Sequence, residues 1–237
     1  MKKLLLALVL LLCSSTIFAQ STIHKSSVFI GLGPSIPTGD FSSTDVSNDK
    51  SGLATTGFYL DLGYQYLFTK NLGVLAFYKW KVNGISEDAL DYSVPTGSGG
   101  SLAVSATSWK VSSTLIGLSQ TFALTKNKKL SIEFREVAGV QFTSSPELNV
   151  NYSIPGIGSS SAKQESQSSI SFAYQLGLGF KYQLNNKLQM RMFGDFNNSN
   201  ASFKEYSITT GGNTVTAPAS KQKTGTIDVG LGLAFGL

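Results

Sequence analysis

Residues 174–196 alternate between large apolar side chains and small or polar ones with almost no break. Successive residues of a β-strand point to opposite faces of a sheet, so a period of two predicts extended structure. Two strands are therefore expected here, joined by a turn at 185–187. The apolar face of the first strand carries Tyr174, Leu176, Leu178, Phe180 and Tyr182, and the other face carries Gln175, Gly177, Gly179 and Lys181.

The same alternation recurs along the chain after residue 20, whereas the 3.6-residue period of a helix is hard to find. Glycine, β-branched and aromatic residues suit extended structure throughout. Eight strands are predicted, at residues 26–36, 56–68, 72–83, 108–124, 130–143, 168–184, 187–197 and 224–237.

The connections between these strands fall into two classes. Three are short turns, at 69–71, 125–129 and 185–187. Short turns at one end and long loops at the other predict an all-β fold, an eight-stranded antiparallel up-and-down transmembrane β-barrel with periplasmic turns and extracellular loops. The long loops are rich in Ser, Gly, Thr and Asn and cover about 38–54, 84–107, 144–167 and 198–223.

The apolar face carries aromatic residues at both ends of the strands and aliphatic residues between them. In the strand at 56–68, Phe58 precedes Leu60 and Leu62, and Tyr64 and Tyr66 follow. Two aromatic girdles around an aliphatic band predict contact with lipid. The opposite face is mostly Gly, Ala and Ser, which suits the narrow interior of eight strands. A soluble lipocalin-like barrel, with its apolar face inward, is the alternative.

Two strands depart from the pattern. Gln120 and Glu136 each fall among the apolar residues of their strands. A bulge that shifts the phase, or a position near the membrane surface, accounts for either residue. The alternation does not choose between the two explanations.

The first nineteen residues have the pattern of a cleaved signal peptide. Lys2 and Lys3 precede the apolar run 4–12, and Ala19 offers a cleavage site, so residues 20–237 form the expected barrel domain. A lipoprotein cut before Cys13 is the alternative. Because Cys13 is the only cysteine, the mature chain is predicted to form no disulfide. Its weak, scattered positive charge gives no reason to expect nucleic acid as a partner.

With these features together, the chain resembles the small outer-membrane β-barrel proteins of the OmpA transmembrane-domain and OmpX type, and in particular the outer membrane protein beta-barrel domain proteins common in Bacteroidota. The stretches that carry the resemblance are "FIGLGPSIPTGDF" (29–41) and "GLGLAFGL" (230–237). The resemblance implies a place in the outer membrane of a Gram-negative cell envelope. It also implies that Gly232, Phe235 and Leu237 form the C-terminal signal for the barrel assembly machinery, although the usual terminal Phe is Leu here.

Catalytic chemistry finds little support in the residue set. A lipid-modifying enzyme of this class needs a base beside a hydroxyl nucleophile. The single histidine, His24, precedes the first strand on the expected periplasmic side. No catalytic residue, metal site or cofactor is therefore predicted, and a lipid-modifying enzyme is kept as a less favoured alternative.

Charged side chains share the interior phase of the strands. Buried charges need partners, so a salt-bridge network that fills the barrel is expected, and a narrow ion or solute pore is the alternative. The interior set is Asp61, Lys79, Lys81, Glu133, Arg135, Lys181, Arg191, Asp195 and Asp228.

The long loops are the expected place of function, because loops on a rigid scaffold commonly carry it. Residues 88–94 and 147–157 are the most apolar pieces and are expected to prolong strands above the membrane, where a sheet edge can recruit a partner strand. The chain is thus predicted to be a non-enzymatic, monomeric barrel with a structural or adhesin-like surface role. Its expected partners are outer-membrane lipid, the assembly machinery and a surface ligand of unknown identity.

Overall fold

The computed structural model describes residues 25–91, 101–154, 158–210 and 213–237. The predicted signal peptide at 1–19 and His24 lie outside these residues. No helix in the described part of the chain is both long and apolar enough to cross a membrane.

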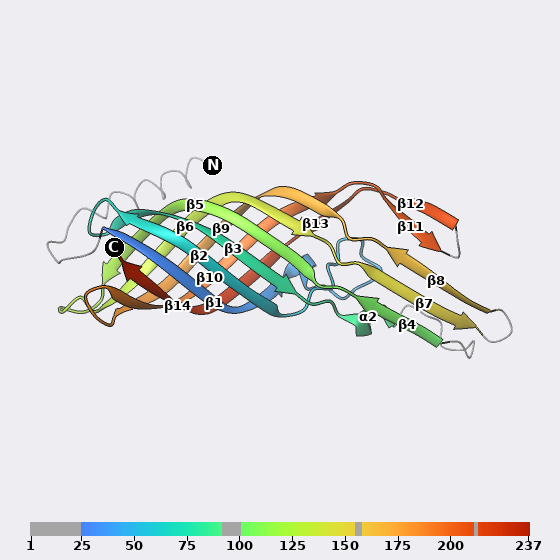
Figure 1. Ribbon diagram of the computed structural model, residues 1–237, viewed down its shortest axis with the longest axis horizontal. Helices are drawn as coiled ribbons and strands as arrows, with labels where there is room; N and C mark the ends of the chain where they lie inside the picture. Colours follow the sequence, from blue (N-terminus) through green and yellow to red (C-terminus); the bar gives the residue numbers. More distant parts are fainter. Residues whose placement is uncertain (1–24, 92–100, 155–157, 211–212) are drawn as a thin grey trace.

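In the described residues, eight antiparallel strands close into a barrel (Figure 1). Neighbours along the chain pair in order, and pairing of the first strand with the last closes the ring. The predicted fold class and the eight predicted strands are confirmed, although the seventh runs on to Phe203 instead of ending at 197. The barrel strands are β1 (Ser26–Thr38), β2 (Gly57–Leu67), β3 (Leu72–Asn83), β5 (Trp109–Ala123), β6 (Leu130–Ser144), β9 (Ser168–Gln183), β10 (Leu188–Phe203) and β14 (Gly225–Gly236).

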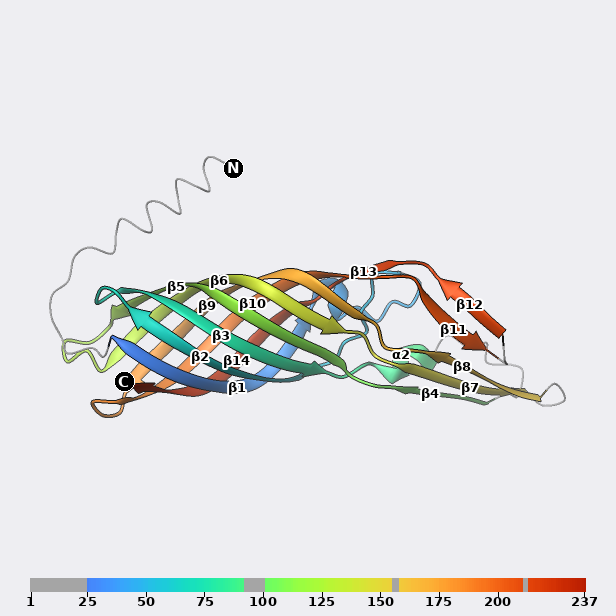
Figure 2. The same cartoon turned by 45° about the horizontal axis from the view of Figure 1, so that its top comes forward.

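A second sheet extends from the loop end of the barrel, opposite the end that holds the C-terminus (Figures 1 and 2). Its strand order is β12-β11-β8-β7-β4. The short elements α2 (Glu87–Asp91) and β13 (Ser220–Lys223) lie between this sheet and the barrel along the chain, and β13 pairs with the end of β10. Another short element, η2 (Gly39–Phe41), follows β1. The sheet strands are β4 (Ser101–Ala106), β7 (Leu148–Ile154), β8 (Gly158–Gln164), β11 (Tyr206–Thr210) and β12 (Asn213–Ala217).

This second sheet corrects the expectation of long irregular loops. The Ser- and Thr-rich composition reads as loop in isolation, but antiparallel partners satisfy the backbone groups once the strands pair. Of the two pieces expected to prolong strands, 147–157 does so as β7, and its residues 155–157 lie outside the described part. Residues 88–91 instead belong to α2, where Glu87 and Asp88 favour a helix start.

The strand register determines how the strands tilt. Paired residues can be followed from strand to strand once around the barrel. A path that starts at Ser26 on β1 returns to β1 at Ile36, ten residues nearer the loop end. Eight strands with this offset tilt by about 40° from the barrel axis. The path passes through Tyr66, Val74, Leu118, Glu136, Leu176, Phe196 and Ile227.

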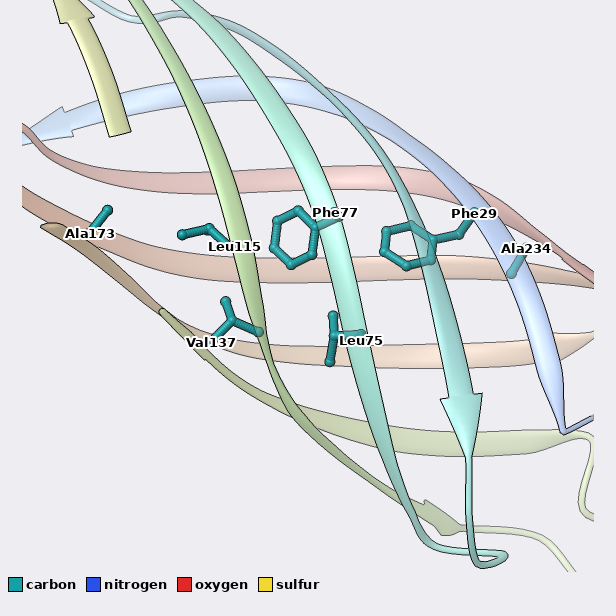
Figure 3. Packing of buried hydrophobic residues seen from close by; sticks show 7 residues of the cluster. All are labelled: Phe29, Leu75, Phe77, Leu115, Val137, Ala173 and Ala234. Atoms are coloured by element: carbon teal, nitrogen blue, oxygen red, sulfur yellow. The ribbon is translucent and has the colours of Figure 1, made fainter. Parts of the chain in front are cut away.

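The interior is filled by inward-pointing side chains. One apolar cluster, shown in Figure 3, brings together side chains from β1, β3, β5, β6, β9 and β14. Small residues make room for it: a Cβ at Gly63 would collide with Phe77 and Phe29. The cluster consists of Phe29, Leu75, Phe77, Leu115, Val137, Ala173 and Ala234.

The outward face is apolar around the barrel, with side chains such as Leu62, Ile116 and Phe172 at least 60% exposed. Gln120 and Glu136 both lie on this face. The register of β5 and β6 runs through both positions without a break, so a bulge does not account for them. Gln120 is covered by its neighbours and is only 4% exposed, whereas Glu136 is half-buried.

Candidate functional site

A first cluster of interior charges, nearer the turn end, is centred on Glu133 of β6. Its carboxylate lies 2.6 Å from Lys181 Nζ and accepts a 2.7 Å hydrogen bond from Arg191 Nη2. Gln65 donates to the same carboxylate over 2.8 Å and accepts from Lys181 over 2.9 Å. Three strands besides β6 thus direct their side chains at one buried carboxylate, which meets the requirement that a buried charge be paired and hydrogen-bonded.

A second cluster lies farther toward the loop end, around Asp195 and Asp228. Asp195 bonds to Arg135 Nη2 at 2.7 Å and to Lys79 Nζ at 3.2 Å. Asp228 accepts from Lys79 Nζ at 2.9 Å, and Lys81 Nζ lies 3.9 Å away. The side chains of Lys79, Asp195, Asp228 and Arg135 have no solvent exposure. Lys79 therefore joins β3 to both β10 and β14 across the barrel.

Asp61 is the interior charge that the structure does not bring into an ion pair among the described residues. It stands opposite Lys79 in the β2–β3 register, yet Lys79 reaches across the barrel instead. Both carboxylate oxygens of Asp61 are buried without a hydrogen-bond partner in the described chain. The alternation placed Asp61 inside the barrel, but it could not show this difference in pairing.

Aromatic rings support the two interior guanidinium groups. Arg135 Cζ lies 4.5 Å from the centre of the Phe193 ring, and Arg191 Cζ lies 4.2 Å from that of Phe29. Cation–π contacts of this kind attract the cation without adding a charge. They hold the long side chains in place between the ion pairs.

An apolar cap that the sequence did not reveal closes the loop end of the interior. Phe41, in the η2 turn, has no solvent exposure, and its ring centre lies 5.4 Å from that of Trp109. Phe203 also packs against Trp109, and the indole donates to the Gly52 carbonyl over 2.9 Å. The available signal was Trp109 itself, an aromatic residue at an inward position where its strand begins.

The sheet above the barrel is much more exposed than the barrel interior. Of its residues whose side chains are described, none is buried. Within the described chain, β4 and β12 form its two ends without a further strand partner. Paired positions give it one half-buried apolar face and one polar face. The apolar face includes Val104, Ala106, Leu148, Val150 and Ala162.

Glu147 ties the base of this sheet together. It accepts from Asn149 Nδ2 over 3.1 Å and lies 3.3 Å from Lys163 Nζ. Hydrogen bonds from Asn149 and Lys163 lower the pKa of the Glu147 carboxyl from its ordinary value. Its backbone N–H also donates to Thr107 Oγ1 over 2.8 Å, which links the start of β7 to the end of β4.

The predicted C-terminal signal residues lie on β14 and just after it. Gly232 pairs with Gly31 and with Arg191, so it has close neighbours on both sides. Phe235 and Leu237 are exposed, and Lys187 Nζ lies 5.8 Å from the centre of the Phe235 ring. Their role in assembly stays a prediction.

Within the described residues, no three His, Cys, Asp or Glu side chains come together in a way that would hold a metal ion.

Comparison with known proteins gives a family match over nearly the whole chain. The family described as "Outer membrane protein beta-barrel domain" matches residues 5–235. No curated protein is similar enough in sequence to count as a relative.

Similar solved structures include Neisserial surface protein A, with 10% identity and a TM-score of 0.47, covering 90% of this chain and 97% of the other. The attachment invasion locus protein Ail of Yersinia pestis has 17% identity and a TM-score of 0.42, covering 89% and 97%. The outer membrane protease OmpT of Escherichia coli has 12% identity and a TM-score of 0.46, covering 94% and 100%.

Proposed function

The chain belongs to the family of outer membrane protein beta-barrel domains, and on this premise we propose that it is a non-enzymatic surface-interaction protein. Family membership confirms the expected outer-membrane localisation and the resemblance to small outer-membrane β-barrel proteins. In this proposal the barrel is an anchor, and the sheet above it receives an extended segment of a partner polypeptide.

The packing of the barrel interior favours a role as a membrane anchor over a role as a channel. Two ion-pair clusters cross the barrel, and the Phe41–Trp109–Phe203 cap covers them at the loop end. An eight-stranded barrel has room inside for little beyond its own side chains. A solute would have to displace paired charges that cost several kcal/mol each to separate.

The observation that carries the proposal is a sheet that, among the described residues, has two unpaired ends and no second layer. A sheet ordinarily buries one face against another element. Here the apolar face of the second sheet is only half-buried, and β4 and β12 keep free edges in the described chain. Free backbone N–H and C=O groups at such an edge bind an added strand, and alternate side-chain positions supply specificity.

Thr216 on β12 offers a direct test. Hydrogen-bonded and non-hydrogen-bonded pairs alternate along an antiparallel ladder. Thr210 and Asn213 flank a two-residue connection and therefore form a hydrogen-bonded pair, so Thr214 and Thr216 belong to non-hydrogen-bonded pairs. Thr214 and Thr216 therefore direct their N–H groups to the free edge. Thr216→Pro removes one of them while leaving the β11 ladder in place.

The experiment pans a phage-displayed random peptide library against proteoliposomes that hold the full barrel. Enriched peptides are expected to alternate β-branched and polar residues, and Thr216→Pro should weaken their binding at least tenfold. Thr216→Val keeps the N–H and should bind as the wild type does. Equal binding by the proline variant would exclude strand addition at β12, and altered lipid A in expressing cells would contradict the non-enzymatic role.

A further inference from the structure

Glu136 is an acidic side chain on the lipid-facing surface, far from either rim. On its own strand it lies between the outward aromatic residues Phe134 and Phe142. Its partners on the neighbouring strands are Leu118 and Leu176, in the aliphatic part of the surface. No hydrogen bond or ion pair joins the Glu136 side chain to another part of the described chain. Ionisable groups at such depth are costly and generally face a partner.

Glu136 is one of three polar-tipped outward residues that follow a diagonal across β5, β6 and β9. Gln120 pairs with Phe134, two residues before Glu136, and Tyr174 pairs with Ala138, two residues after it. Each step thus crosses one strand and advances two residues. With about 4.8 Å between strands and about 6.6 Å per two residues, the step lies about 36° from the strand direction.

The ten-residue offset of the barrel shows which way this diagonal points. The path of paired residues rises toward the loop end as it passes from β5 through β6 to β9. Each step from Gln120 to Glu136 to Tyr174 combines a move to the next strand with a move of two residues along the strand toward the loop end. The sideways components of these two moves are opposite and nearly cancel, whereas both moves rise toward the loop end. Because the strands tilt by about 40°, the three residues form a column almost parallel to the membrane normal.

The chemistry of this column is self-complementary. Of its members, Glu136 and Tyr174 reach the surface, and a carboxyl group holding a proton and a phenol each both donate and accept hydrogen bonds. A two-fold axis along the membrane normal relates two copies without changing the depth of any group in the membrane. Each residue of the column then lies opposite the same residue of the other copy, as in an isologous interface. Between the girdles, no outward Lys or Arg of the described strands could pair with Glu136 in another arrangement.

We propose that the outward face of β5, β6 and β9 is a dimer interface within the membrane, where Glu136 meets Glu136 of a second copy through a shared proton. Two carboxyl groups can hydrogen-bond to each other when one of them carries the proton. Tyr174, which is 40% exposed, extends the contact toward the loop end. Gln120 continues the column toward the turns but lies beneath its neighbours, so it does not reach the second copy. This dimer replaces the expectation of a monomer.

Cross-linking in liposomes tests the interface with Glu136 still present. Ala138→Cys places a thiol beside Glu136 on β6, and the mature chain contains no other cysteine. A short bismaleimide should yield a dimer from this variant. Leu62→Cys, equally central on β2, is the matched control and should stay monomeric.

Substitutions of Glu136 then separate hydrogen bonding from packing. Adding Glu136→Leu to Ala138→Cys should lower dimer yield about tenfold, the effect of losing a buried hydrogen bond in a membrane. Glu136→Gln keeps a self-complementary group and should retain most of the dimer. Three results would overturn the proposal. They are a dimer yield from Leu62→Cys equal to that from Ala138→Cys, no dimer from Ala138→Cys, and a dimer yield that Glu136→Leu does not change. Heat-modifiable gel mobility shows that each variant is folded.

Discussion

The barrel and the sheet above it use the same antiparallel strand pairing, but the barrel interior buries its side chains whereas the upper sheet leaves its described side chains at least partly exposed. Inside the barrel, charged groups such as Lys79 and Asp195 have no solvent exposure at all. In the upper sheet, no residue with a described side chain is buried, and its ion pair between Glu147 and Lys163 is partly exposed. The difference teaches that strand pairing alone does not determine burial: packed interior side chains stabilise the barrel, whereas the described side chains of the upper sheet stay accessible to solvent.

The largest expected effect comes from removing Asp195. Asp195→Ala leaves Arg135 without its ion pair and should lower the free energy of unfolding by about 3–5 kcal/mol. Urea unfolding in lipid vesicles, followed by the fluorescence of Trp80 and Trp109, measures it. Asp195→Asn retains a hydrogen-bond acceptor and should cost less. A loss as small as that from Lys163→Ala in the upper sheet, about 0.5 kcal/mol or less, would contradict the contrast between the regions.

Removing the cap should have the next largest effect. Phe41→Ala empties a fully buried site against Trp109 and should cost about 3 kcal/mol. The same variant tests whether the interior is sealed, through conductance in planar bilayers. We expect the wild type to conduct no ions and Phe41→Ala to conduct few, since the ion-pair clusters remain. Steady wild-type conductance that disappears when Lys181 and Arg191 are neutralised would favour the pore instead.

The smallest effect concerns pH in the upper sheet. Because the pKa of Glu147 is lowered in the folded state, the ionised carboxylate stabilises the folded sheet. This stabilisation is complete above about pH 4.5 and is lost as the pH falls through the folded-state pKa. Carboxyl NMR titration should show this pKa moving up in Asn149→Ala, and less in Lys163→Ala. The barrel's unfolding midpoint should not change in either variant. A pKa of Glu147 that is unaltered in both would contradict the hydrogen bonds.

The parts of the fold that depend on local alternation were predictable from the sequence. The strand at 72–83 has the predicted bounds, because each side chain on it faces either lipid or the interior. The inward phase likewise brought Lys181 and Arg191 together with Glu133, since all three share one face of the sheet.

Features that depend on contacts between distant segments were not predictable. Phe41 lies in a turn whose sequence does not show that it folds back over the barrel. The strands of the upper sheet are rich in Ser, Thr and Asn, a composition that also suits loops, so the pairing between these strands was not visible in the sequence. Lys79 had Asp61 as its nearest carboxylate by register, and only the cross-barrel distances show that it bonds to Asp195 and Asp228.

The closing pair of strands, β1 and β14, bears on how the chain reaches this structure. Their register joins Ser27 to Gly236 and Thr38 to Gly225, so the contact spans nearly the full described sequence. Contacts between such distant residues form slowly, because the entropy of closing the long loop opposes them. Until they form, β1 and β14 each expose an unpaired edge capable of aggregation. The nascent chain therefore depends on being kept apart from its own copies until the last strand has joined the first.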